Sequence, residues 1–345
     1  MKVAITGATG FIGSALCRYL GERGHDVLGL ARSVERSESL GRAGIAVGVA
    51  DVTDRSALQQ ALAGCDAVIH TAALFNRPEA SWDQFREVNV VGTRNVLEAA
   101  RANGLRRAVH TSTVGVAMGS TSPPYDERAP YGPPPSDKYE VTKCEGERGA
   151  LAFHRETGFP VVVLRPAQVY GPGDRSKAKF YRLVQKGVIV NEGATFKHLV
   201  YIDDLCRAFE LALTSERAVG EVVIVAGPEP APLRELVRLV ADDLGVAPPR
   251  VRLPATPVVL ACAAVEAACN LARVKPVLFR RSMDFFTRSA VFGTDKAREV
   301  LGFEAECGVR TGVRNTVAWY REQGLLGGAE PAAASVRRSA AVTDA

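Results

Sequence analysis

Short apolar segments alternate with amphipathic stretches over the first half of the chain. Residues 3–5 form an apolar run that ends at a glycine-rich turn, and residues 14–20 follow with the spacing of an amphipathic helix. The same alternation predicts further strands at residues 25–31, 45–50, 67–70, 107–110 and 161–164, and helices at residues 34–43, 56–63 and 82–103. Strands that alternate with helices form right-handed β-α-β units. We therefore predict an α/β fold with a doubly wound parallel sheet.

The regular alternation loosens after residue 174. Helices are predicted at residues 180–185, 202–213 and 232–244, with short strands between them. We assign residues 1–174 to the sheet domain and residues 175–326 to a smaller C-terminal α/β lobe that covers a substrate and is partly interleaved with the sheet. Residues 327–345 lack hydrophobic periodicity and are expected to form a disordered tail.

Residues 257–272 are almost wholly apolar and rich in alanine. Only Glu266 and Asn270 interrupt them. The stretch is shorter than the ~20 residues that a helix needs to cross a bilayer. Two interpretations remain: a helix that packs over the C-terminal lobe, or an interfacial helix that dips into a membrane surface.

Composition and charge exclude several classes of protein. The formal net charge of +5 is spread over short pairs such as Arg106-Arg107 and Arg337-Arg338, without a basic block, which argues against a nucleic-acid partner. The cysteines include no C-x-x-C pair and the histidines are scattered, so no metal site is indicated. The first strand begins at Lys2 and leaves no room for a signal peptide, so we expect a cytoplasmic protein with reduced thiols.

The glycine-rich turn at residues 6–13 carries the first candidate chemistry. It has the spacing G-x-x-G-x-x-G and stands directly after a strand and before a helix. Backbone N–H groups at a helix N-terminus, together with the positive end of the helix dipole, favour a bound phosphate. Gly7 permits the tight turn, Gly10 lets the backbone approach a pyrophosphate, and Gly13 lets the helix pack close to its strand. The turn therefore predicts a dinucleotide site.

A tyrosine and a lysine four residues apart carry the second candidate chemistry. Tyr139 and Lys143 lie on a predicted helix, so their side chains project from one face. An ammonium group beside a phenol favours the phenolate, which suits proton exchange with an alcohol or a ketone. The hydroxyls of Thr111, Ser112 and Thr113 end the preceding strand, where one of them can hydrogen-bond a substrate oxygen.

Together these motifs resemble the extended branch of the short-chain dehydrogenase/reductase superfamily, also called the NAD-dependent epimerase/dehydratase family. TGATGFIG at residues 6–13 matches the nucleotide motif of that branch residue for residue. Supporting matches follow in order at residues 51–52, 68–73, 89–96, 165–166, 169–173 and 200–205. The resemblance covers nearly the whole chain before residue 327 and implies a Rossmann-type sheet with an NAD(P) cofactor.

The resemblance implies a role for each matched residue. Tyr139 would be the acid/base, Lys143 would lower its pKa and hydrogen-bond the nicotinamide ribose, and Thr113 would take the place of the usual catalytic serine. Ser112 remains an alternative to Thr113, because the family more often has two serines here. Met118 stands where sugar-nucleotide members often have tyrosine. The residues implied to contact the cofactor are Gly7, Thr9, Gly10, Phe11, Ile12, Gly13, Arg32, Ser33, Asp51, Val52, Thr71, Ala72, Ala73, Tyr139, Lys143, Pro166 and Val169.

The end of the second predicted strand bears on the choice between NADP and NAD. An acidic residue at this position accepts hydrogen bonds from the adenine ribose 2′-OH and repels a 2′-phosphate. The chain has Arg32 and Ser33 here, and no acidic residue before Glu35. The guanidinium of Arg32 can pair with the phosphate, and Ser33 can add a hydrogen bond. We predict NADP, with NAD as the alternative if Arg32 stacks on the adenine instead.

The C-terminal lobe bears on the substrate. It lacks the Arg-Pro-Gly-Asp-like stretch of the family's UDP-sugar epimerases, although Arg280 or Arg281 could meet a phosphate; residues 279–286 and 292–303 resemble the 3β-hydroxysteroid and sterol dehydrogenase members. We predict an NAD(P)-dependent oxidoreductase that interconverts a secondary alcohol and a ketone on an apolar, steroid-like or polyketide-like substrate. The alternatives are a nucleotide-sugar epimerase or dehydratase, and a non-catalytic dinucleotide sensor, although such sensors typically lack the Tyr-Lys pair. The resemblance also implies a homodimer, formed through the helices at residues 82–103 and 139–149.

Overall fold

The computed structural model describes residues 1–33, 38, 40–77, 79–118, 124–190, 195–271 and 281–326. Within them, a seven-stranded sheet has the strand order β11-β6-β5-β4-β1-β2-β3, and every neighbouring pair is parallel. The strands are β1 (Lys2–Thr6), β2 (Asp26–Ala31), β3 (Ala46–Val49), β4 (Ala67–His70), β5 (Arg107–Thr111), β6 (Val161–Pro166) and β11 (Val222–Val225). The predicted Rossmann-type parallel sheet is confirmed.

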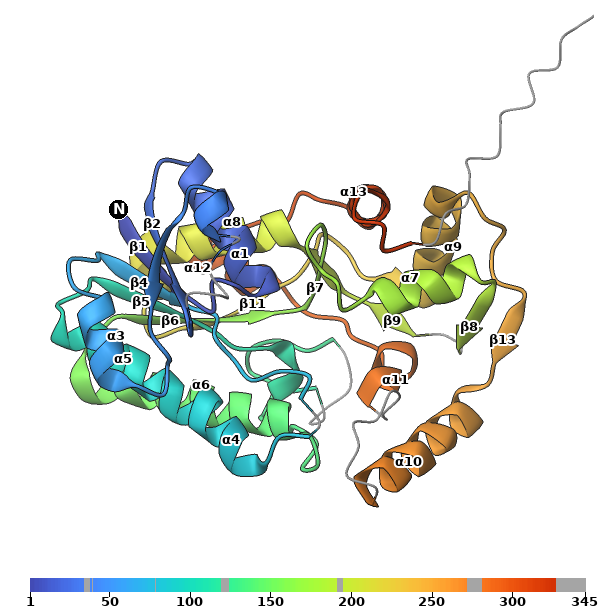
Figure 1. Cartoon of the computed structure of the whole chain (residues 1–345), viewed down its shortest axis with the longest axis horizontal. Helices are drawn as coiled ribbons and strands as arrows, with labels where there is room; N and C mark the ends of the chain where they lie inside the picture. The colour runs from blue at the N-terminus through green and yellow to red at the C-terminus, as the bar shows by residue number, and fades with distance from the viewer. Residues whose placement is uncertain are drawn as a thin grey trace, which may run out of the picture.

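Helices cover both faces of this sheet (Figure 1). On one face lie α1 (Phe11–Glu22) and α8 (Ile202–Thr214), and on the other α3 (Arg55–Ala61), α5 (Gly92–Ala102) and α6 (Lys138–Thr157). Alternate side chains of a strand enter the two hydrophobic cores: Val3 and Ile5 pack on the α1 side, and Ala4 packs on the α5 side. Because both faces of the central strands are buried, β1, β4 and β6 each contain a run of at least three apolar residues, whereas the edge strand β3 is only partly buried.

The helix predicted at residues 82–103 is divided by a π-helical turn. α4 (Trp82–Arg86) begins at a capping box formed by Ser81 and Gln84, and η1 (Glu87–Val91) follows it before α5. The prediction of a single regular helix was wrong at this turn. The amide of Asn89 bonds groups outside its own helix, and those contacts stabilise a wider turn that hydrophobic periodicity does not record.

A smaller lobe follows the sheet domain, and two segments from this part of the chain return to the sheet. The remaining elements are η2 (Val114–Val116), β7 (Gln168–Tyr170), α7 (Ala178–Gln185), β8 (Val188–Val190), β9 (Phe196–Lys197), β10 (Leu199–Tyr201), η3 (Glu216–Ala218), β12 (Ala231–Pro232), α9 (Leu233–Leu244), β13 (Val251–Leu253), α10 (Ala255–Leu271), α11 (Arg281–Thr287), α12 (Asp295–Leu301) and α13 (Val309–Glu322). α8 packs against α1, and β11 pairs with β6. The lobe lies beyond the carboxyl end of β6 (Figure 1).

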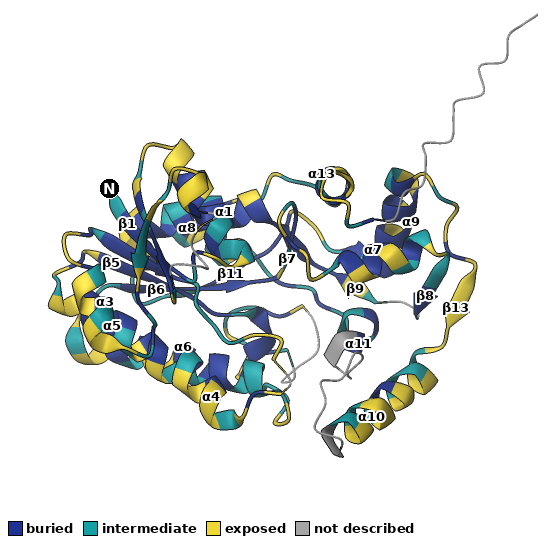
Figure 2. Cartoon of the chain, in the orientation of Figure 1, coloured by how far each residue is buried: buried dark blue, intermediate teal, exposed yellow. Residues whose placement is uncertain are grey.

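The apolar stretch predicted as a helix at residues 257–272 is α10, at the edge of the lobe (Figure 1). Among residues 255–269, only the side chain of Cys262 is buried, and Figure 2 shows how much of the helix is exposed. Val258 and Val259 contact the core of the lobe, so the helix touches the lobe along one edge. In the described part of the chain, no helix has the length and apolar content to cross a membrane.

Some sequence-based predictions fall outside the described residues. They concern residues 34–37 and 39 of the helix predicted at 34–43, the loop segment 119–123, residue 272 at the end of the apolar stretch, residues 279 and 280, and the tail at 327–345. Residues 38 and 40–42 of the helix predicted at 34–43 are helical.

Candidate active site

The glycine-rich turn joins β1 to α1 and has no space for a side chain at two of its glycines. Gly7 has a φ of +70°, and a Cβ there would lie 2.7 Å from the backbone N of Ala72. A Cβ on Gly13 would lie 2.2 Å from the carbonyl O of Gly7, so the first turn of α1 rests directly on the loop. Gly10 is the N-cap of α1, and both Gly10 and Thr9 are exposed. The helix N-terminus therefore faces solvent without a side-chain cap.

The segment after β4 lies beside this turn. The hydroxyl of Thr71 donates to the carbonyl O of Thr6 at 2.7 Å, and the N–H of Ala72 donates to Thr6 Oγ1 at 3.4 Å. Thr71, Ala72 and Ala73 are all half-buried. The structure thus brings together the glycine turn and the predicted residues 71–73 at the carboxyl edge of the sheet, where parallel sheets bind their ligands.

α6 supplies the predicted tyrosine and lysine. It begins at Asp137, whose carboxylate accepts from the backbone N–H of Tyr139 at 3.0 Å. Lys143 is 2% exposed, and its Nζ donates to the carbonyl O of Thr111 at 2.5 Å. Burial lowers the pKa of Lys143 to about 8, although the negative charge of Glu147 acts in the opposite direction.

The two candidate hydroxyls at the end of β5 have different partners. Ser112 is buried, and its Oγ donates to Oε2 of Glu147 at 2.5 Å. Thr113 is half-buried, and its Oγ1 accepts from the backbone N–H of Gly115 at 3.2 Å. The bond made by Ser112 uses its proton, whereas the bond made by Thr113 uses an oxygen lone pair.

A buried network of polar groups supports α6, and the sequence analysis missed it. Glu147 is fully buried, and Arg165 donates to both of its carboxylate oxygens, from Nη2 at 2.5 Å and from Nε at 3.0 Å. The hydroxyl of Tyr131 donates to Oε1 of Glu147 at 2.7 Å. Glu147 stands four residues after Lys143 on the same helix face, and this spacing is the one feature of the sequence that could have indicated it as a site residue. Its partner Arg165 comes from another element, so no local pattern marks the pair.

Two uncharged histidines lie in the sheet near Lys143. His70 of β4 and His110 of β5 are paired in register, with ring centroids 5.3 Å apart. His70 forms hydrogen bonds with Thr6 Oγ1 at 2.7 Å and with Thr93 Oγ1 at 3.1 Å. Burial first, and then the positive charge of Lys143, lowers the pKa of His70 to about 3 and that of His110 well below its usual value. Among the described residues, no group of three His, Cys, Asp or Glu side chains could hold a metal ion.

Asn89, in the π-helical turn, joins the segment after β4 to α6. Its Oδ1 accepts from the N–H of Leu74 at 2.7 Å, and its Nδ2 donates to Oγ1 of Thr142 at 2.9 Å. α6 crosses close to this turn, because a Cβ on Gly146 would lie 2.4 Å from the carbonyl O of Asn89. These contacts fix the helix that carries the tyrosine and lysine relative to the segment after β4.

Apolar groups border Tyr139. Its ring meets that of Phe75 edge to face, with centroids 4.8 Å apart, and Phe75 is 51% exposed. Met118, in the segment after β5, is half-buried, and its carbonyl O accepts from Nη2 of Arg288 at 3.0 Å. This bond joins the lobe to the segment after β5.

The residues predicted at the adenine ribose lie at the ends of β2 and β3. Arg32 is exposed and Ser33 is half-buried, directly after β2. Oδ1 of Asp51 accepts from both the backbone N–H and the hydroxyl of Thr53, each at 2.9 Å. Val52 is buried beneath α5. This end of the sheet therefore presents an exposed guanidinium, while one oxygen of the nearby carboxylate is engaged in a local turn.

The remaining predicted cofactor residues lie around the start of α1. Pro166 is buried at the end of β6, and Val169 is half-buried in β7. A Cβ on Gly173 would lie 3.3 Å from the ring of Phe11, so the loop after β7 passes over the first turn of α1. Ile12 is half-buried next to it. The N-terminus of α1 is open to solvent, and the backbone of the glycine turn leaves no side chain in front of it. This arrangement fits the pyrophosphate of a dinucleotide.

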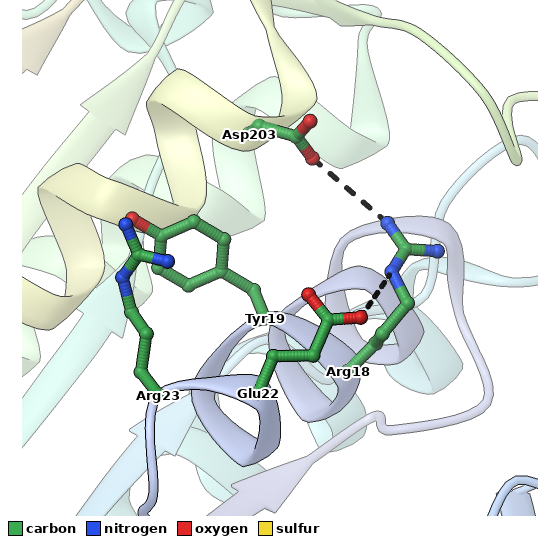
Figure 3. A pocket seen from close by; sticks show the side chains of 5 residues that line it. All are labelled: Arg18, Tyr19, Glu22, Arg23 and Asp203. Carbon is green, nitrogen blue, oxygen red and sulfur yellow. Dashed lines mark ion pairs between the residues drawn. The ribbon is translucent and has the colours of Figure 1, made fainter.

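A hollow of about 230 Å³ lies between α1 and α8, at the end of α1 remote from the glycine turn (Figure 3). It is lined by Arg18, Tyr19, Glu22, Arg23 and Asp203. Its charged groups face one another: the guanidinium of Arg18 lies 3.9 Å from carboxylate oxygens of both Glu22 and Asp203. None of these residues belongs to the predicted site.

A comparison with known families decides the class of this protein. Residues 3–227 match the family described as "NAD dependent epimerase/dehydratase family". The chain belongs to this family. It is an enzyme of the extended short-chain dehydrogenase/reductase type with a nicotinamide cofactor, as the motifs of the sequence implied.

Curated relatives carry out several different reactions. The chain is 35% identical to "2-alkyl-3-oxoalkanoate reductase" of Stenotrophomonas maltophilia, over 73% of this chain and 77% of that protein. It is 32% identical to "3 beta-hydroxysteroid dehydrogenase/Delta 5-->4-isomerase" of Mycobacterium tuberculosis, over 73% and 72% of the two chains. It is also 30% identical to "dTDP-glucose 4,6-dehydratase" of Streptomyces niveus, over 93% of each chain. These names agree on the family and differ on the substrate.

Proposed function

We propose that this enzyme interconverts a secondary alcohol and a ketone on an apolar substrate. The observation that carries the proposal is the geometry at the start of α6. Tyr139 and Lys143 lie one helical turn apart, the ammonium bonds the end of β5, and Thr113 follows on the same segment. A nicotinamide cofactor, when bound, supplies or accepts the hydride.

Two side chains, Tyr139 and Thr113, would act on the substrate oxygen, and Lys143 would act on Tyr139. Tyr139 donates a proton to it during ketone reduction and removes that proton during alcohol oxidation. Lys143, as an ammonium group, stabilises the phenolate that Tyr139 becomes. Thr113 donates a hydrogen bond to the same oxygen, because the proton of Ser112 is already shared with Glu147.

The surroundings of Tyr139 support an apolar substrate. Phe75 presents an exposed ring at the edge of the tyrosine. Met118, in the segment after β5, stands where sugar-nucleotide members of the family often have tyrosine. Two of the relatives are named for an alkyl-substituted oxo acid and for a hydroxysteroid, and both compounds are largely hydrocarbon. These observations favour an alkyl ketone or a polycyclic alcohol over a sugar.

We further propose NADP as the preferred form of the cofactor. Arg32 offers an exposed guanidinium at the end of β2, with Ser33 beside it. A guanidinium pairs with a 2′-phosphate through two parallel hydrogen bonds. Titration of native protein and Arg32→Asp with NADPH and NADH tests the proposal: the native chain should favour NADPH and the variant should not. Equal affinities in the native chain, or an unchanged ratio in the variant, would contradict it.

A nucleotide-sugar reaction is the second candidate, favoured by the dehydratase relative and by a buried cation in the lobe. Lys197 is 2% exposed, donates to the carbonyl O of Arg288, and lies 5.5 Å from the ring centroid of Phe285. Burial lowers the pKa of Lys197 to about 8. We rank this candidate second, because groups of the lobe already satisfy the ammonium.

Nicotinamide absorbance distinguishes the two candidates. The native chain is mixed with NADPH and, in parallel, with an alkyl 3-oxo acid or a 3-oxosteroid. A separate arm contains dTDP-glucose with oxidised NAD or NADP, because a dehydratase or an epimerase first transfers hydride from the sugar to the cofactor. We expect NADPH to be consumed in proportion to an apolar ketone and dTDP-glucose to remain unconverted. Conversion of dTDP-glucose, detected by chromatography without net formation of reduced cofactor, would instead establish the second candidate.

The assignment of the hydroxyl has its own test. Thr113→Val should lower the turnover number by ~10²–10³, the usual effect of removing one donor to a developing oxyanion. Its melting temperature should fall only modestly, because the variant also loses the hydroxyl that caps η2. Ser112→Ala should lower the melting temperature and retain most of the turnover, because it removes a partner of Glu147. The reverse pattern would assign the role to Ser112.

A further inference from the structure

Exposed apolar side chains gather on α10 and on the strand before it. Four of the ten large apolar residues that are exposed in the described chain lie within residues 251–265, namely Val251, Leu253, Leu260 and Val265. Along α10 the exposed positions recur at three- and four-residue intervals, so they form one face of the helix. We call this face the apolar stripe, and it consists of Pro257, Leu260, Ala261, Ala264, Val265 and Ala268.

The described residues of the lobe leave the apolar stripe uncovered. α10 is held on its opposite edge, where Cys262 is buried and Val258 and Val259 contact the core. Leu260 is 66% exposed and Val265 is 40% exposed. A helix that is apolar on every side normally lies inside a protein or against lipid, and contiguous exposed apolar surface marks an interaction site.

The excess positive charge of the chain falls in the part of the sequence that contains this helix. Residues 248–281 contain six basic residues and one acidic residue, a local charge of +5, which equals the net charge of the whole chain. Arg250 and Arg252 are exposed immediately before α10. The other four basic residues follow α10 in the sequence. The rest of the chain is neutral overall, so this segment differs from it in charge as well as in polarity.

We propose that α10 docks on an anionic membrane surface. The apolar stripe would enter the boundary between headgroups and acyl chains, and the exposed Arg250 and Arg252 would contact lipid phosphates. A helix of this length extends about 25 Å, enough to lie along a bilayer surface. The charge favours lipid over a second copy of the chain, because self-association through the stripe would bring two strongly positive segments together.

Vesicle flotation of the full chain tests the proposal. Vesicles of phosphatidylcholine alone are compared with vesicles that also contain phosphatidylglycerol, at low and high salt. We expect binding to the anionic vesicles at least about tenfold stronger than to the neutral ones, and weaker at high salt because salt screens the charges of Arg250 and Arg252. Equal binding to both kinds of vesicle, or binding to neither, would overturn the proposal.

Charge-inserting variants locate the surface that binds. Leu260→Glu combined with Val265→Glu should lower binding to anionic vesicles by at least about tenfold. Val49→Glu is the matched control, since Val49 is 50% exposed on the edge strand β3, and it should bind as the native chain does. Cofactor binding by both variants verifies that they fold. Sedimentation that shows a dimer dissolved by the double substitution, without vesicle binding by the native chain, would assign the stripe to a second copy instead.

Discussion

α6 and α10 are helices of similar length in which polarity and burial are inverted. α6 buries Lys143 and Glu147, which are 2% and 0% exposed, whereas α10 exposes Leu260 and Val265. Burial of a charge is unfavourable unless the charge is paired, and exposure of apolar surface is unfavourable in water. Each helix therefore holds side chains in an unfavourable environment: α6 has charged groups in the interior, and α10 has apolar groups in water.

The two helices differ in where the compensation comes from. For α6 it is internal: Glu147 is paired with Arg165, and the Lys143 ammonium bonds the carbonyl O of Thr111. For α10, the compensation that we propose is external, in the form of a lipid surface. A buried charged side chain that the fold pairs with a partner indicates a site for chemistry. An apolar side chain that the fold leaves exposed indicates a surface for binding.

Removal of the Tyr139 hydroxyl should produce the largest effect. Tyr139→Phe keeps the ring against Phe75 and removes the group proposed to transfer the proton, so turnover should fall by ~10²–10⁴ while cofactor binding persists. Tyr19→Phe is the control, because Tyr19 lies in the hollow of Figure 3. Initial rates and cofactor titrations measure both effects. Near-native turnover of Tyr139→Phe would refute the assigned chemistry.

Neutralisation of the buried carboxylate of α6 should strongly destabilise the fold. Glu147→Gln leaves the Arg165 guanidinium buried without its counter-charge, which typically costs ~3–5 kcal/mol. Glu145→Gln, two residues earlier on the same helix, alters an exposed pair with Arg86 and should leave the melting temperature unchanged. Urea unfolding of both variants measures the difference. Similar stabilities of the two would show that the buried network contributes little.

The stability of the cofactor-free protein should rise with pH in the range where Lys143 titrates. Its pKa is about 8 in the folded chain against an ordinary value of 10.5, so between these values the unfolded chain binds more protons. The free energy of unfolding should therefore increase from about pH 8 to 10.5, and Lys143 should contribute at most ~1.4 kcal/mol per pH unit to this increase. Below about pH 8, Lys143 is protonated in both the folded and the unfolded chain, so its titration should not change the stability. Lys143→Met should lack this contribution, and identical pH profiles for the two proteins would contradict the shift.

Truncation on the exposed face of α10 should have the smallest effect. Leu260→Ala removes apolar atoms that are already in water, so the free energy of unfolding should change by less than ~0.5 kcal/mol. Leu97→Ala on α5 removes a fully buried leucine and should cost ~2–5 kcal/mol. A comparable loss for both would mean that the native protein covers Leu260.

Most of the fold could be predicted from the sequence, because buried parallel strands are short apolar runs and the glycine turn has a fixed position between strand and helix. The strand at residues 67–70 was predicted with the bounds of β4. The π-helical turn was not, since it depends on the partners that Asn89 finds in Leu74 and Thr142. Apolar composition predicted the helix at α10, but it gives no sign of which face is left exposed.

The candidate site was predicted in part for the same reason. Tyr139 and Lys143 are local to one helix, so their spacing in the sequence reveals their common face. The pairing of Glu147 with Arg165 and Ser112 joins three elements and is visible only in three dimensions. That pairing distinguishes Ser112, whose hydroxyl is bonded to Glu147, from Thr113, the other hydroxyl that the sequence left as an alternative.

During synthesis on the ribosome, the sheet remains incomplete until late. β11 is the edge strand next to β6, and α8 covers α1, so both are needed before the sheet has its final edge and its second helical layer. Roughly fifty residues separate β6 from β11, and a ribosome that adds ~5–20 residues per second needs several seconds to produce them. Over that interval the nascent chain presents β6 as an open edge to other strands. A chain that stalls before residue 222 would keep that edge permanently.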